Sequence, residues 1–283
     1  MWSIFRKVAP SKNFSADYHR GKKDAKRYPL WIKPDKKLKL DDVFNIVRDH
    51  YEGTDYDMTK GLTAGPFGNP NRFRPLSWEY DSLDYSWERP VSTMNTAFSF
   101  VAQSRSYLPD PIGGIVWYGV DDTYTTCYFP VYCSVNEISK PFATGDIQKF
   151  SWDSAWWVFN FVANYINIRY ADMILDVKEV QNRLETQFIK EQDSLILKFK
   201  TLNKNDQIEM LNKYSWDAGK KVHQEWVELA EHLITKYNDG YIKNSKGQPK
   251  ENGYPLEWKR KIIKHEKEKY LIPEWQDNNK YEH

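Results

Sequence analysis

The side chains with the clearest chemical potential in this sequence lie in two stretches, residues 48–71 and 98–134. The first carries Asp49 and Asp57, which are candidates for holding a substrate amine because a free ammonium group needs a carboxylate partner. The second carries Arg105, just after an apolar run and before a Pro-punctuated turn. A guanidinium at the mouth of a sheet is a fixed donor for a carboxylate or a developing oxyanion. The alternative is an arginine that neutralises a nearby carboxylate such as Asp110.

A metal site is the next possibility in the first stretch, because imidazole and carboxylates occur there at short spacing. The candidate ligands are His50, Glu52, Asp55 and Asp57. Their spacing matches neither a zinc-binding helix nor an EF-hand loop. We therefore predict a hydrogen-bonded loop and no metal. No glycine-rich phosphate loop is present, and no cofactor is predicted.

Two cysteines, Cys127 and Cys133, are present, without a C-x-x-C spacing or a paired histidine motif. No zinc site or disulfide framework follows from them. A bridge between them would need the strand to bend at Pro130, so two free, buried thiols are predicted.

The elements that must position these groups are predicted to be mainly strands in the first half of the chain and helices in the second half. Residues 98–134 are rich in β-branched and aromatic residues and are cut by turn signals, which predicts three short strands folded back on one another. A helix is predicted to begin at Asp41 or Asp42 and to end at Gly53. Glu88 and Arg89, where the chain returns to the strands, are predicted to tie down an edge.

The second half of the chain is predicted to be helical. A helix-entry signature at residues 151–154 precedes an aromatic stripe of Trp157, Phe161 and Ile168, and Trp226 belongs to a later long helix. These stripes are interpreted as core. The predicted organisation is α+β, with mixed helix and strand in residues 1–150 and a mainly helical region in 151–283.

Composition narrows the range of partners. Lys and Arg total 41 against 39 acidic residues, a net charge of +2, which is too balanced to indicate nucleic acid or an anionic membrane as a partner. The longest apolar stretch, 155–168, contains three asparagines and is too short for a membrane span. The sequence contains no signal that identifies the cellular compartment of the protein. The default is cytoplasmic, and a preceding signal peptide would make it secreted or periplasmic.

Several long motifs resemble the bacterial cysteine dipeptidases of the N-terminal-nucleophile hydrolase superfamily, which are related to secernins. The likeness covers roughly residues 1–200 and lies in RDHYEGT (48–54), DMTKG (57–61), AGPFGNPNR (64–72), QSRSYLP (103–109) and FSWDSAWWVFN (150–160). It implies an αββα sandwich of two stacked sheets covered by helices.

The resemblance also implies a mechanism in which the first residue of the mature chain is a cysteine whose own α-amino group is the base. Here residue 1 is Met, and both cysteines are internal. We therefore expect this chain to be the C-terminal part of a dipeptidase, inactive alone, with a dipeptide substrate and the missing N-terminal portion as partners. A homo-oligomer is also possible, because a truncated sandwich would expose sheet edges or an apolar face.

The resemblance raises four residues as site candidates. Arg105 is predicted to contact the oxyanion or the substrate, and Asp49, Asp57 and Asn69 are predicted to bind substrate from the polar loop. The alternative function is a non-catalytic interaction protein, or a module that binds peptide or carbohydrate through exposed tryptophans. Burial of Trp226 and of the 152–161 stripe would weaken that alternative, and a contiguous exposed patch would revive it.

Overall fold

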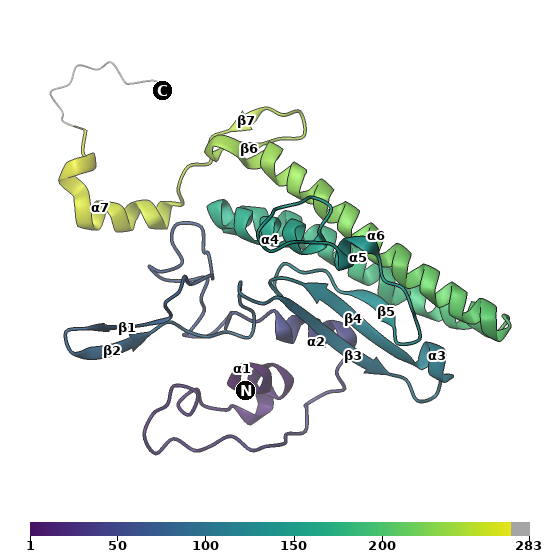
Figure 1. Cartoon of the computed structure of the whole chain (residues 1–283). Coiled ribbons are helices and arrows are strands. Elements are labelled where there is room, and N and C mark those ends of the chain that lie inside the picture. Colours follow the sequence, from purple (N-terminus) through teal and green to yellow (C-terminus); the bar gives the residue numbers. More distant parts are fainter. Residues whose placement is uncertain (273–283) are drawn as a thin grey trace.

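A three-stranded antiparallel sheet lies at the centre of the computed structural model, which describes residues 1–272 (Figure 1). Its strands are β3 (Phe98–Ser104), β4 (Gly114–Val120) and β5 (Phe129–Tyr132), in the order β3-β4-β5. The turns fall at the Pro and Gly signals between β3 and β4 and at Asp121-Asp122 after β4. The prediction of three strands folded back on one another is confirmed.

Three helices pack against this sheet: α4 (Ala155–Tyr165), α5 (Tyr170–Phe199) and α6 (Lys204–Tyr237). Figure 1 shows α5 and α6 lying side by side along much of their length. Ser154 is the N-cap of α4, as the helix-entry signature predicts. Asn203 caps α6 by accepting hydrogen bonds from the amides of Asn205 and Asp206.

The aromatic residues of these helices are only partly core. Trp226 is completely buried and stacks on Phe159, with ring centroids 4.6 Å apart. The predicted stripe on α4 is displaced, however, because the buried face carries Val158, Phe159 and Val162. Ile168, assigned to the core, is 57% exposed, since a 3₁₀ segment (Ile166–Arg169) interrupts the helical period after α4.

The amino-terminal part contains α1 (Trp2–Val8) and α2 (Leu40–Val47). Lys39 is the N-cap of α2, and the side chain of Asp42 accepts a hydrogen bond from the Lys39 amide at 2.8 Å. The predicted end at Gly53 is wrong, because α2 ends before Arg48. Arg48 and Asp49 turn their side chains into buried ion pairs, and Tyr51 has a left-handed backbone with φ of +63°.

The remaining elements are short or peripheral. They are β1 (Ser77–Tyr80) with β2 (Leu83–Ser86), α3 (Asp110–Gly113), β6 (Ile242–Lys243) with β7 (Pro249–Lys250), α7 (Leu256–Tyr270), and 3₁₀ helices at Pro10–Lys12, Lys140–Ala143 and Asn238–Gly240. The protein is thus α+β. Residues 1–272 contain one three-stranded sheet and two hairpins, so the second stacked sheet of the expected sandwich is not among them.

One face of the central sheet is apolar yet incompletely covered. Phe98 and Phe100 of β3 are 56% and 57% exposed and lie opposite Val120 and Tyr118 of β4. A hollow of about 460 Å³ opens on this face, lined by apolar side chains that include Val116, Tyr118, Phe129, Val131 and Phe142. In residues 1–272, β3 pairs on one side alone, which leaves an edge strand without a charged residue.

Candidate functional site

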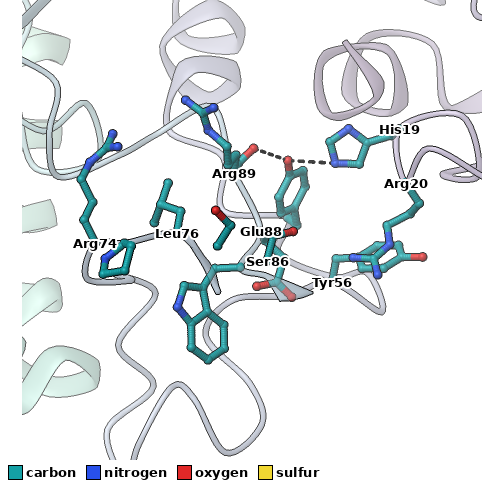
Figure 2. A pocket seen from close by; sticks show the side chains of 12 residues that line it. His19, Arg20, Tyr56, Arg74, Leu76, Ser86, Glu88 and Arg89 are labelled. Atoms are coloured by element: carbon teal, nitrogen blue, oxygen red, sulfur yellow. Dashed lines mark hydrogen bonds between the residues drawn. The ribbon is translucent and has the colours of Figure 1, made fainter. Parts of the chain in front are cut away.

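A charged hollow lies between the amino-terminal loops and the base of the β1–β2 hairpin (Figure 2). Its volume is about 790 Å³, ample for a small organic molecule. Its walls come from three segments distant in sequence: His19 and Arg20; Tyr51 and Tyr56; and residues 74–77 with 86–89. We call it the arginine cavity, because Arg20, Arg74 and Arg89 all line it.

The charged groups of this cavity are not neutralised by one another. Within residues 1–272, none of the three arginines forms an ion pair, and neither does Glu88, the one acidic residue in the wall. Figure 2 shows Glu88 between Arg74 and Arg20 in this view. The Arg20 guanidinium lies over the Tyr56 ring, 5.1 Å from its centroid, which restricts its orientation. The cavity therefore offers both cationic and anionic contacts.

Tyr51 holds two walls of the cavity together. Its hydroxyl donates to the carbonyl oxygen of Arg89 at 2.5 Å and lies 3.1 Å from Nε2 of His19, the two contacts dashed in Figure 2. Burial, with the nearby charges of Asp49 and Glu88, raises the pKa of Tyr51 to about 12. Burial also lowers the pKa of His19 below its ordinary value. Both groups are therefore neutral at pH 7 and serve as hydrogen-bonding groups.

A second, narrower hollow shares Arg74, Glu88 and Arg89 with the arginine cavity and reaches Arg72. Arg72 binds the carbonyl oxygens of Met58 and Asn69, so it fixes the loop below the cavity. Burial lowers the pKa of Arg72, and the negative charge of Glu88 opposes that shift. Glu88 thus faces both hollows.

Asp49, one of the residues predicted from sequence, does not line the arginine cavity. It is fully buried, accepts a hydrogen bond from Ser3, and forms ion pairs with Arg6 at 2.5 Å and Lys7 at 3.0 Å. Its backbone carbonyl accepts a hydrogen bond from Ser92. These contacts fasten α1 to the loop after α2.

Asp57 and Asn69 shape the polar loop itself. The Asp57 carboxylate accepts hydrogen bonds from the amide of Gly53 and from the amide and hydroxyl of Thr59. The side-chain oxygen of Asn69 accepts from the amide of Asn71. Both arrangements are local turns. Asn69 also lines a separate surface hollow of about 610 Å³ beside Phe67 and Tyr254.

Arg105 is placed away from the arginine cavity, at the turn between β3 and α3. It is buried, its guanidinium donates to the carbonyl oxygen of Ile112, and it lies 5.9 Å from the centre of the Tyr132 ring. Its partner is therefore a backbone carbonyl rather than Asp110. The structure does not bring Arg105 together with Asp49, Asp57 or Asn69 in one pocket.

The cysteines correct one prediction. Both are free, as expected, but Cys133 is exposed. It follows directly after β5, where its sulfur lies beside Gly114. Cys127 is fully buried, and burial, reinforced by the charge of Glu185, raises the pKa of its thiol well above the ordinary value.

No local pattern in the sequence marks this cavity, because its walls come from segments that only folding brings together. Arg20 belongs to an irregular basic segment, and Glu88 and Arg89 were assigned to an edge. The available signal was the pair of opposite charges before Pro90, which a spacing rule does not distinguish from a surface ion pair. Within residues 1–272, no group of three or more His, Cys, Asp or Glu is arranged to hold a metal ion. None of the described helices has the length and apolar character to cross a bilayer.

Comparison with known proteins places the chain in a class of peptide hydrolases. Peptidase family C69 matches residues 1–183, well over half of the sequence, so the chain belongs to this family. The predicted kinship with bacterial dipeptidases is confirmed at that level.

Relatives found by sequence comparison carry dipeptidase names, in agreement with this family. A probable dipeptidase of Latilactobacillus sakei is 22% identical over 50% of this chain, one of Salmonella dublin is 28% identical over 37%, and a probable dipeptidase B of Streptococcus pyogenes is 20% identical over 78%. The matched stretches span 26%, 20% and 42% of those relatives. The match therefore involves less than half of each longer protein.

Proposed function

We propose that this chain is the substrate-binding part of a dipeptidase whose cysteine nucleophile lies in a portion that the sequence does not contain. The observation that carries the proposal is a large cavity, in a member of a peptidase family, whose charges of both signs form no ion pair within residues 1–272. In the proposed reaction, a thiolate attacks the peptide carbonyl carbon and the amine leaves with a proton. Water then cleaves the resulting thioester.

The cysteines present here do not supply that nucleophile. Cys127 is buried in the core, and burial raises the pKa of its thiol above the ordinary value, so little of it is present as the thiolate. Cys133 is accessible but internal, so it has no α-amino group to act as its base. The family resemblance suggests Arg105 as an oxyanion or substrate contact and Asp49, Asp57 and Asn69 as substrate-binding residues. None of the four lines the arginine cavity, and each makes contacts within the chain. We therefore assign substrate binding to the arginine cavity.

We further propose that the missing portion packs on the apolar face of the central sheet. Phe98, Phe100 and Tyr118 lie there, around the 460 Å³ hollow, and β3 offers free backbone groups to a further strand. The two-sheet sandwich implied by the family resemblance needs a second sheet against such a face. The matched relatives are long enough to supply it.

Assembly tests the proposal. We expect the purified chain to form a complex with the separately produced residues that precede the matched stretch of the Streptococcus pyogenes relative, and the mixture to hydrolyse dipeptides. A Phe100→Asp variant should weaken assembly at least tenfold, because it puts a charge into the apolar contact. Phe73→Asp, at a side chain 70% exposed and outside the sheet, is the control.

Co-purification and gel filtration with light scattering measure the outcome. Equal assembly of the Phe100→Asp and Phe73→Asp variants would contradict the assigned face. If the chain alone forms a dimer that dissociates in the Phe100→Asp variant, a second copy of the chain occupies the apolar sheet face instead.

A non-catalytic binding function is the second candidate, and one observation favours it. Phe150 and Trp152 are 43% and 41% exposed, and their ring centroids lie 5.0 Å apart at the surface. Trp226 and Phe159 are buried, which weakens that hypothesis, but Trp156, Trp157 and Phe161 of the same stretch are half-buried. Saturable binding of an oligosaccharide or a long peptide that is lost in Trp152→Ala would support it.

A further inference from the structure

The arginine cavity contains opposite charges that form no ion pair within residues 1–272, and a free dipeptide carries the same two charges at its ends. We propose that Glu88 binds the free ammonium group of the dipeptide and that Arg20 binds its free carboxylate. This inference rests on the proposed function and assigns the end groups of its substrate.

Glu88 fits the ammonium role because of its position in the cavity. It is half-buried and is the one carboxylate in the wall of about 790 Å³. Within residues 1–272 it has no ion pair, and no side-chain hydrogen bond occupies its oxygens. An ammonium group placed there gains a charge-assisted hydrogen bond without displacing an existing partner.

Arg20 fits the carboxylate role better than the other two arginines. Its guanidinium is held against the Tyr56 ring, so less side-chain freedom is lost when a ligand binds. Among the residues that the structure describes, Arg74 lies over no aromatic ring as Arg20 does, and in Figure 2 the Arg89 side chain extends away from Glu88. Arg20 and Glu88 come from loops 68 residues apart in sequence and face the same hollow.

Recognition of both ends implies selectivity for dipeptides over longer or blocked peptides. An N-acetyl group removes the positive charge that Glu88 would bind, and a C-terminal amide removes the negative charge that Arg20 would bind. A longer peptide loses more conformational freedom when both of its ends are held in one cavity of about 790 Å³. The cavity thus provides a physical reason for a chain-length limit.

The test is calorimetric titration of the intact chain with three probes: alanyl-alanine, its N-acetyl form and its C-terminal amide. Because we expect no turnover by this chain alone, the peptides stay intact during the titration. Free alanyl-alanine should bind at least tenfold more tightly than either blocked form. Glu88→Gln should weaken binding of the free dipeptide about tenfold and leave binding of the N-acetyl form unchanged. Arg20→Gln should weaken binding of the free dipeptide about tenfold and leave binding of the C-terminal amide unchanged.

Matched controls are Glu79→Gln on the exposed β1 strand and Arg27→Gln on an exposed loop, neither of which lines the cavity. Equal binding of all three probes, no binding of alanyl-alanine, or a loss in Glu88→Gln that is the same for free and acetylated peptide would overturn the assignment. Failure of dipeptide hydrolysis in the assembled enzyme would instead remove the proposed function, whatever pattern these titrations give.

Discussion

Glu185→Ala is expected to destabilise the protein by about 3–5 kcal/mol, a large fraction of the stability of a typical domain, which is about 5–15 kcal/mol. Glu185 on α5 is buried and accepts two hydrogen bonds from the Arg48 guanidinium, at 3.0 Å and 2.5 Å, and a third from the Tyr128 amide at 2.8 Å. Removing the carboxylate leaves the buried charge of Arg48 without its counter-charge. It also leaves the Tyr128 amide without an acceptor.

Urea unfolding monitored by tryptophan fluorescence measures this effect. The control is Glu225→Ala, which removes an ion pair to Arg183 whose side chain is 51% exposed, and should change stability by about 0–1 kcal/mol. The double variant Arg48→Met with Glu185→Leu should recover most of the loss, because it removes both buried charges. Equal losses in Glu185→Ala and Glu225→Ala would show that the buried pair does not join α5 to the loop after α2.

The second large expected effect is a stabilisation of the folded protein at high pH by the substitution Asp121→Asn. Asp121 is 1% exposed, and one carboxylate oxygen has no hydrogen-bond partner, while the other accepts from Asn160 at 2.9 Å. Burial, with a smaller contribution from the charge of Asp122, raises the pKa of Asp121 to about 7. The folded protein therefore holds a proton that the unfolded chain releases near pH 3.8.

The direction of the pH dependence follows from this difference. Asp121 does not destabilise the folded protein below about pH 4, and its destabilising effect grows as pH rises to about 7, because ionising the buried group costs up to about 4 kcal/mol. Asp121→Asn avoids that cost and tolerates the positive φ of +63°. We expect the variant to be more stable than wild type at pH 8, with the advantage disappearing near pH 4. Asp55→Asn, at an exposed position, is the control, and a stability difference that does not change with pH would contradict the account.

Much of the fold follows from local patterns in the sequence. The strands β3 to β5 were predictable because alternating apolar residues and turn signals lie within 37 consecutive residues. The start of α4 was predictable from its cap at Ser154. The end of α2 was not, because Arg48 leaves the helix to pair with Glu185, 137 residues away, and no local signal encodes that partner.

The candidate site was less predictable for the same reason. Asp49, Asp57 and Asn69 occur in a dense polar loop, which marks chemistry but equally marks turns and buried ion pairs, and the structure shows them making such contacts. Arg20 and Glu88 look ordinary in sequence. Folding brings both to the wall of one cavity, and within residues 1–272 neither of them forms an ion pair.

The central claim is that this chain binds substrate but lacks the nucleophile. The most direct measurement is the release of amino acids from a panel of dipeptides by the purified chain. The account predicts no release above a blank without protein. Turnover that disappears in Cys127→Ala or Cys133→Ala would contradict it, because an internal thiol of this chain would then be performing the reaction.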